Sequence, residues 1–269
     1  MKKYMVRCDI EGVSGVVSYE QAEPGKPEFA FGQKMFMSDL LALIEGLNAG
    51  GADEIVIYDE HYYGRNIDID LMPENVTAIC GKPPYKVGWA GGLDESFSGL
   101  ILLGFHSKCN TGELLHHSYE PDIKDLILNG VSVGEIGIEA AIAGDYDVPL
   151  VMITADSAGV VEAEKLVPGV VGVSVKESLS SDGGACPSAK KTAGMIRDAA
   201  ASLVTNSPSL QPWKIIGPKL EIVFNSGPYH DKFRELYSCG DSVSLTGSTV
   251  TECWAKYWQM KLATQEAMR

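Results

Sequence analysis

Acidic residues and histidines follow three short apolar segments of this chain, at the points where those segments end. Asp9 and Glu11 follow the first segment, Asp59 and His61 follow the second, and His106 follows the third. In open α/β sheets, ligands bind beyond the carboxyl ends of the strands. If the three segments are neighbouring strands, their carboxylates and imidazoles should meet at one edge of the sheet.

Further groups of the same kind are expected at this edge. Glu135 opens a predicted helix just after a hairpin, and His116 and His117 lie in the loop after His106. Four of the five histidines therefore fall in or beside predicted edge loops, and only His230 lies elsewhere.

A mixed set of carboxylates and imidazoles suits Zn²⁺, Mn²⁺ or Co²⁺ better than Ca²⁺ or Mg²⁺, which prefer oxygen ligands. A catalytic zinc takes about three protein ligands. Five candidates therefore favour two ions that share a bridging carboxylate, as in aminopeptidases and phosphatases. Two such ions polarise a carbonyl and lower the pKa of a bridging water. The motif H-E-x-x-H is absent, which excludes a zincin.

Each of these residues alone has an ordinary explanation. Asp9 and Glu11 could be loop acids, and Glu135 could be a first-turn acid that complements the helix dipole. A lone His61 or His106 would more often be structural, so the metal hypothesis depends on the set. The sequence contains no G-x-x-x-x-G-K-[ST] phosphate loop and no G-x-S-x-G nucleophile motif, so nucleotide and serine-hydrolase chemistry are not indicated. Asp59 is expected to orient His61 or a nearby helix.

The elements that must position these residues alternate between apolar runs and helical patterns, which is typical of an α/β protein. Strands are expected over Tyr4–Cys8, Glu54–Tyr58, Gly99–Phe105, Pro149–Ile153 and Val170–Val175. Helices are expected over Gln33–Asn48, Gly134–Gly144, Val160–Leu166 and Pro187–Leu203. Asn129-Gly130 suits the type I′ turn of a hairpin between Leu126–Leu128 and Val131–Val133. We therefore predict a largely parallel, three-layer αβα sheet domain.

A proline-rich segment predicts a division into two domains. Ser207–Pro218 carries three prolines and is the best linker candidate. We expect residues 1–206 to form the α/β metal-binding catalytic domain. Residues 207–269 should form a smaller two-layer α+β domain with a role in oligomer contacts. Its expected elements are strand Leu220–Phe224, helix Asp231–Tyr237, strand Ser242–Thr246 and helix Cys253–Ala267.

The composition narrows the class of partner. The 269 residues include 36 acids against 22 Lys and Arg, a formal net charge of −14. Nucleic acids and anionic membranes need a basic face, so neither is an expected partner. The chain has no apolar stretch of about 18 residues, and its first apolar run is too short for a signal peptide. The six cysteines are sparse and include no C-x-x-C. We therefore expect a cytoplasmic protein with mostly reduced thiols.

Several motifs together carry a resemblance to a known family. They are Asp9-Ile10-Glu11-Gly12-Val13-Ser14-Gly15, Asp59-Glu60-His61, Gly104-Phe105-His106, His117-Ser118, Asn129-Gly130, Val133-Gly134-Glu135-Ile136-Gly137 and Tyr146-Asp147-Val148-Pro149. Along essentially its whole length the chain resembles the M55 metallopeptidases, the D-aminopeptidase family whose type member belongs to a bacillary dipeptide-transport operon.

The resemblance implies a site with two Zn²⁺ ions per subunit, for which Mn²⁺ or Co²⁺ could substitute. The implied metal ligands are Asp9 (bridging), Glu11, His61, His106 and Glu135. His117 matches the catalytic histidine of the family, which acts as general acid/base or stabilises the oxyanion. The implied reaction is aminopeptidase hydrolysis of short peptides with an N-terminal D-residue such as D-Ala, by a metal-bridging hydroxide. The family also implies a homodecamer of two stacked pentamer rings, with active sites that face an inner chamber.

Two residues depart from the family pattern. Glu60 stands where Ser is usual, which would place an extra carboxylate beside the metals. Cys8 precedes Asp9, and a thiol on a buried strand is expected to be inert. Neither of the remaining histidines has a matched role. We expect His116 in solvent or in loop packing, and His230 in a surface loop.

Two alternative functions stay open on the residues alone. A dimetal phosphoesterase would use the same ligands, but it would also need cations for the phosphate, and only Arg65 and Lys108 are obvious candidates. A peptide-binding protein without turnover is disfavoured, because all six functional positions are retained.

Overall fold

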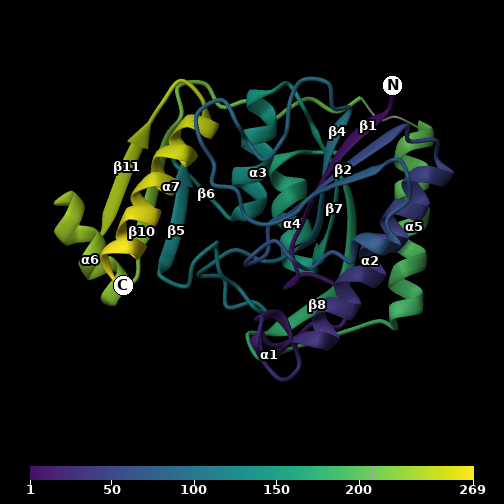
Figure 1. Ribbon diagram of the computed structural model, residues 1–269, viewed down its shortest axis with the longest axis horizontal. Helices are drawn as coiled ribbons and strands as arrows, with labels where there is room; N and C mark the ends of the chain where they lie inside the picture. The colour runs from purple at the N-terminus through teal and green to yellow at the C-terminus, as the bar shows by residue number, and fades with distance from the viewer. Residues whose placement is uncertain (207–208) are drawn as a thin grey trace.

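The central feature of the fold is a sheet of seven strands. The computed structural model describes residues 1–206 and 209–269 (Figure 1). The strands lie in the order β3-β2-β1-β4-β7-β8-β9. Their bounds are β1 Lys3–Cys8, β2 Glu54–Asp59, β3 Val76–Ile79, β4 Gly99–Phe105, β7 Leu150–Asp156, β8 Val171–Ser180 and β9 Gly183–Ala185. All neighbouring pairs are parallel except β8 and β9. The carboxyl ends of β2, β1 and β4 therefore lie side by side.

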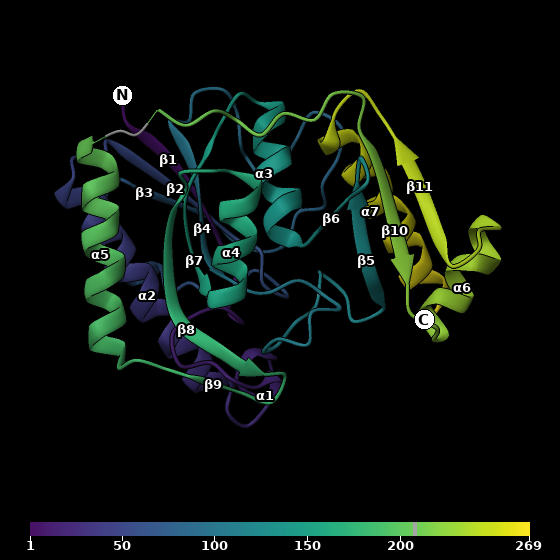
Figure 2. The ribbon, with the colours of Figure 1, turned by 180° about the vertical axis from the view of Figure 1, so that it is seen from behind.

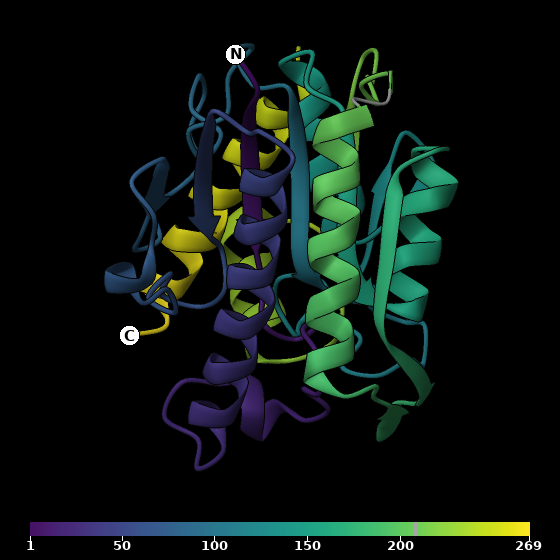
Figure 3. The same ribbon diagram turned by 90° about the vertical axis from the view of Figure 1, so that its right-hand side faces the viewer.

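Helices cover both faces of this sheet. The helices α2 (Phe29–Ala49) and α5 (Ala189–Asn206) pack together on one face (Figure 3). The helices α3 (Glu135–Asp145) and α4 (Ser157–Leu166) lie on the other. Alternate residues of a strand point to opposite faces. Accordingly, Ile101 and Leu103 of β4 pack in the cluster with α2, and Leu100 and Leu102 pack in the cluster with α3. The predicted α/β class is confirmed.

A second, antiparallel sheet lies beside the first (Figures 1 and 2). Its strands lie in the order β11-β10-β5-β6. Their bounds are β5 Ile123–Leu128, β6 Val131–Val133, β10 Lys219–Phe224 and β11 Ser242–Thr246. The helix α7 (Val250–Ala267) packs on β10 and β11, and α6 (Pro228–Tyr237) packs on α7. Asn129 and Gly130 have φ of 49° and 83°, as the predicted type I′ hairpin turn requires.

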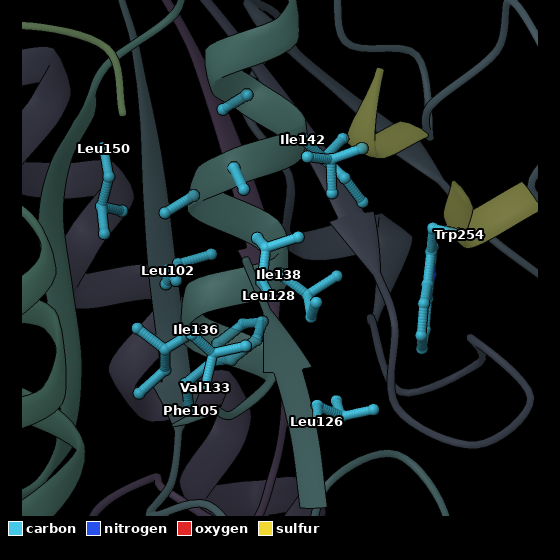
Figure 4. Close-up of a cluster of buried hydrophobic side chains, with 14 of the residues drawn as sticks. Leu102, Phe105, Leu126, Leu128, Val133, Ile136, Ile138, Ile142, Leu150 and Trp254 are labelled. Carbon is cyan, nitrogen blue, oxygen red and sulfur yellow. The ribbon is translucent and has the colours of Figure 1, made fainter. Parts of the chain in front are cut away.

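The two sheets share one hydrophobic core. The chain after residue 209 supplies β10, α6, β11 and α7 in the predicted order, whereas β5 and β6 come from the earlier part of the chain. Figure 4 shows side chains of β4, α3, β5 and α7 together, among them Leu102, Ile138, Leu128 and Trp254. A division at residue 206 therefore cuts the small sheet into two pairs of strands, because the hairpin β5–β6 pairs with β10 across it.

Other differences from the sequence-based expectations are local. The helix α2 begins at Phe29, and the short elements α1 (Tyr19–Ala22), η1 (Ile69–Leu71), β3 and β9 were not expected. Of the predicted linker 207–218, residues 207–208 lie outside the described residues, and 209–218 contain no helix or strand. All six cysteines are free. Among the described residues, no helix has the length and apolar character needed to cross a bilayer.

Candidate metal centre

Asp9, Glu11 and His61 form a first cluster at the carboxyl edge of the main sheet. Asp9 and Glu11 lie in the loop after β1, and His61 follows β2, the parallel neighbour of β1. One ligand-type atom from each residue lies within 4.8 Å of the other two. His61 Nε2 is 3.5 Å from Glu11 Oε1. All three residues are buried.

His106, His117 and Glu135 form a second cluster. His106 follows β4, Glu135 is the first residue of α3, and His117 lies in the loop between β4 and β5. Glu135 Oε1 is 3.4 Å from His106 Nε2 and 3.9 Å from His117 Nε2. The two imidazole rings are stacked, with 4.1 Å between their centroids.

Asp9 connects the two clusters. Its side chain belongs to the first cluster, and its Oδ2 lies 3.5 Å from Nε2 of His106 in the second. The structure thus brings together all six residues that the sequence predicts for the site. The Asp9 carboxylate thus contacts residues of both clusters.

The donor atoms of both clusters suit a transition metal. His106 Nδ1 is 2.9 Å from the carbonyl oxygen of Ser107, so Nδ1–H donates there and Nε2 is the nitrogen that a neutral imidazole would offer to a metal. Among the described residues, Nε2 of His61 and His106 and Oε2 of Glu11 are buried without a hydrogen-bond partner. Buried polar atoms are rarely left unpaired. The residues present therefore fit the zinc that the family implies.

The three buried carboxylates shift the pKa values of their histidine neighbours. Burial disfavours the charged form of His106, but the nearby carboxylates of Asp9 and Glu135 outweigh it and raise the pKa of His106 well above its usual range. Burial likewise opposes ionisation of Glu11, but His61 outweighs it and holds the pKa of Glu11 well below its usual range. The site therefore favours positive charge next to ionised acids, and a divalent cation supplies the same compensation.

Close backbone contacts hold the two loops that carry these side chains. Gly12 N–H donates to Gly104 O at 2.8 Å, and a Cβ at Gly12 would lie 1.6 Å from Phe105 O. Gly104 has a φ of +73°, and a Cβ there would lie 2.2 Å from Asp9 O. Only glycine fits at either position. These two glycines therefore allow the Asp9–Glu11 loop to lie against the end of β4.

Lys176 of β8 holds the same loop from inside the protein. Its side chain is buried, and its ammonium donates to the carbonyl oxygens of Glu11, Val13 and Val16. Burial lowers the pKa of Lys176 to about 8. Lys176 was not among the site residues predicted from the sequence. The one sequence feature that marks it is its position directly after the predicted strand that ends at Val175.

Ser14, in the same loop, binds the helices that cover the sheet. Asp39 of α2 accepts a hydrogen bond from Ser14 N–H at 2.8 Å. Ser14 Oγ lies 2.9 Å from Asp39 Oδ1 and 2.7 Å from Thr192 Oγ1 of α5. Burial raises the pKa of Asp39 to about 6. These contacts explain why the loop motif contains a serine that is not a nucleophile.

The loop that carries His117 has a strained backbone. Asn110, Leu115 and Tyr119 have φ of 62°, 53° and 59°, a region that residues with a Cβ rarely occupy, and such strain clusters at functional sites. Tyr119 N–H donates to Glu135 Oε1 at 2.6 Å, which ties the loop to the second cluster. His117 Nδ1 is 2.9 Å from Leu115 O, so Nδ1–H donates to this carbonyl and the Nε2 side of the ring faces Glu135.

Asp59 is connected to His61 through Asn66, which was not predicted from the sequence. Asp59 accepts hydrogen bonds from the backbone N–H and the side-chain amide of Asn66, at 2.7 and 2.9 Å. The same amide nitrogen lies 3.3 Å from His61 Nδ1. Asn66 therefore transmits the position of Asp59 to the imidazole, and leaves His61 Nε2 facing Glu11.

Glu60 belongs to a buried ion-pair network. Its Oε1 accepts a hydrogen bond from Tyr85 OH at 2.9 Å and lies 3.6 Å from an Arg7 nitrogen. Arg7 is fully buried and also pairs with Glu139 of α3. The expectation of an extra carboxylate at the metals is therefore corrected, because this carboxylate balances the charge of Arg7.

The remaining expectations from the sequence have different outcomes in the structure. Burial raises the pKa of the Cys8 thiol well above its usual range, in keeping with an inert thiol. His116 Nδ1 lies 2.6 Å from Glu113 O, in loop packing. The expectation of a surface loop at His230 is wrong. His230 is buried in α6 and stacks on Phe224 with ring centroids 5.4 Å apart, because the helix begins at Pro228.

An α/β sheet covered on both faces, with two carboxylate–histidine clusters at its carboxyl edge, is the arrangement of a metal-dependent enzyme. The chain belongs to the M55 peptidase family, whose model is described as D-aminopeptidase and matches residues 1–255. It is therefore a hydrolase of the D-aminopeptidase type, as predicted.

Two relatives from Bacillus subtilis are similar to this chain. A D-aminopeptidase of strain 168 is 29% identical over 213 residues, which cover 79% of this chain and 77% of the relative. The solved structure of the Zn-dependent D-aminopeptidase DppA, described as a self-compartmentalizing protease, matches with a TM-score of 0.89 and 25% identity. That match covers 99% of this chain and 98% of DppA.

Proposed function

We propose that this protein is a zinc-dependent aminopeptidase that removes the N-terminal residue of short peptides, with a preference for D-residues such as D-Ala. One observation carries the proposal: two buried carboxylate–histidine clusters meet at Asp9, whose Oδ2 lies 3.5 Å from His106 Nε2. The family and the zinc dependence of DppA support it.

Asp9, Glu11, His61, His106 and Glu135 would hold two zinc ions, with Asp9 shared between them. When bound, the ions supply Lewis-acid chemistry, which polarises a carbonyl and acidifies water near neutral pH. Asn66 and Tyr119 orient two of the ligands, because Asn66 contacts His61 and Tyr119 N–H donates to Glu135. The protein thus contributes a buried and pre-oriented set of donors.

His117 is the residue proposed to move the proton or to stabilise the oxyanion. Its Nδ1–H donates to Leu115 O, so Nε2 is the nitrogen that would exchange the proton. The side chain is 19% exposed, whereas that of His106 is 1% exposed, and a substrate can therefore reach it. Its contact with Glu135 and its stacking on His106 hold the ring at the second cluster. Protein groups in this role contribute about 10²–10⁴-fold to the rate.

We further propose a cytoplasmic homo-oligomer of two stacked pentamer rings, with residues 207–269 in the subunit contacts. The description of DppA as self-compartmentalizing supports an assembly of this kind. Sedimentation velocity tests the proposal, since a decamer and a monomer differ tenfold in mass.

The phosphoesterase alternative has no specific support at the site. Lys108 Nζ donates to Ser132 O at 3.2 Å, and the Arg65 guanidinium lies over the Tyr63 ring, 6.0 Å from its centroid. Both cations that the sequence offered for phosphate therefore have other partners.

The decisive experiment combines elemental analysis with paired substrates. We expect about two zinc ions per chain after preparation without chelators, and faster cleavage of D-Ala peptides than of L-Ala peptides or phosphate esters. Glu11→Gln should lower the zinc content, whereas Glu20→Gln, an exposed acid in α1, should not. Fewer than one zinc per chain, or cleavage of phosphate esters alone, would contradict the proposal.

A further inference from the structure

A hollow of about 280 Å³ opens beside His117. His117, Tyr19, Asn110, Lys124 and Asn225 contribute to its lining, together with Cys109, His116, Pro121 and Ile123. Tyr19 meets the His117 ring edge-on, with 5.9 Å between centroids. The hollow thus begins at the residue proposed to act on the scissile bond.

Both sheets contribute to the walls of this hollow. Asn110 and His117 come from the loop after β4, Lys124 lies on β5, and Asn225 directly follows β10. Asn225 N–H donates to Asp122 O at 2.7 Å, which fixes the end of β10 against the start of β5. Ligand sites commonly lie at such junctions between structural units.

The charge of the lining is unlike that of the whole chain. Acids outnumber Lys and Arg by 36 to 22 in the sequence, yet no Asp or Glu lines this hollow. Lys124 is exposed there and forms no ion pair within the described part of the chain. Two amide side chains, Asn110 and Asn225, add hydrogen-bonding groups. This combination of one ammonium and two amides suits a small anion.

A short peptide brings such an anion with it. An aminopeptidase substrate places its first amide bond at the metal cluster, and two extended residues span only about 7 Å. The C-terminal carboxylate of a di- or tripeptide would therefore fall close to His117. On the basis of the proposed function, we propose that this hollow binds the C-terminal α-carboxylate of di- and tripeptides through Lys124, so that the enzyme selects peptides with two free ends.

The test measures binding with a non-hydrolysable probe. The probe is D-Ala-D-Ala in which a methylene-amine group replaces the amide bond, and its partner is the same molecule with a C-terminal carboxamide. Calorimetry on the zinc-loaded protein should show at least about tenfold tighter binding of the free acid, in line with a hydrogen bond to a charged group. Lys124→Gln should remove that preference and leave the affinity for the carboxamide within about threefold. Lys124→Arg should retain the preference.

Lys108→Gln is the matched control, since Lys108 lies in the neighbouring loop, contacts Ser132 and does not line the hollow. It should leave both affinities unchanged. Zinc content and melting temperature of Lys124→Gln should match those of the native protein, because the side chain is exposed.

The outcomes separate this proposal from the proposed function. Equal affinity for the acid and the carboxamide, a preference that persists in Lys124→Gln, or no detectable binding of the acid would each overturn the carboxylate subsite. A Lys124-dependent preference without cleavage of D-Ala-D-Ala would uphold the subsite and refute the peptidase proposal.

Discussion

Replacement of Asp39 by Asn tests how the loop that carries Glu11 is held. Asp39 is buried in α2 and receives the Ser14 N–H at 2.8 Å. Asn keeps an oxygen that can accept this hydrogen bond, and its amide group can donate to the Ser14 hydroxyl. The variant therefore imitates the protonated carboxyl and cannot ionise.

The magnitude follows from the pKa of Asp39, which burial raises from 3.8 to about 6. A carboxyl with a raised pKa binds its proton more tightly in the folded state, so stability falls as pH rises from about 4 to above 6. The full cost of ionisation is about 3 kcal/mol, at about 1.4 kcal/mol per pH unit between the two pKa values. By the same relation, about 1.4 kcal/mol of this cost develops between pH 5 and pH 8.

The assay is urea unfolding of the native protein and Asp39→Asn at pH 5 and pH 8, at a fixed saturating zinc concentration. The free energy of unfolding of the variant minus that of the native protein should rise by about 1.4 kcal/mol between the two pH values. The control is Asp198→Asn in α5, whose side chain is 79% exposed and whose effect should not depend on pH. If Asp39→Asn shows the same difference at both pH values, then ionisation of Asp39 carries no folding cost and the reasoning is refuted.

Three further substitutions test the site itself. His117→Ala should lower the rate by about 10²–10⁴-fold while zinc content stays unchanged. A loss of zinc in this variant would instead make His117 a ligand. Lys176→Met removes the ammonium that binds the loop carbonyls of Glu11, Val13 and Val16 and should weaken zinc binding about 10–100-fold in a chelator competition. Unchanged zinc affinity with lowered stability would limit Lys176 to a role in folding. Gly12→Ala would place a Cβ 1.6 Å from Phe105 O and should lower the free energy of unfolding by more than about 3 kcal/mol. A native-like melting temperature would show that the loop can move away from β4.

The elements and the candidate ligands could be predicted from local sequence. Continuous apolar runs indicate buried parallel strands, and residues directly after such strands must lie at the carboxyl edge of the sheet. The location of Asp9, Glu11, His61 and His106 at this edge could therefore be predicted, whereas their assignment as ligands depended on the whole set and on the family resemblance. The hairpin turn at Asn129-Gly130 could also be predicted from local sequence, since two adjacent residues that tolerate positive φ specify it.

The partners of these residues depend on contacts between distant parts of the chain. Lys176 lies 165 residues from Glu11, and Thr192 lies 178 residues from Ser14, so no local pattern pairs them. The pairing of Glu60 with Arg7 could not be predicted from local sequence either, because the two residues become neighbours when the strands β1 and β2 lie side by side.

Local sequence is thus enough to identify the residues at strand ends, because strand periodicity and turn chemistry act over a few residues. The order of the strands, the pairing of β5 with β10, the placement of His117 against His106 and the hollow beside Lys124 could be found in the folded protein alone. These features form when side chains that are far apart in the sequence pack together and lose their contact with water. The strength of such packing and polar contacts depends on the complete core that surrounds them.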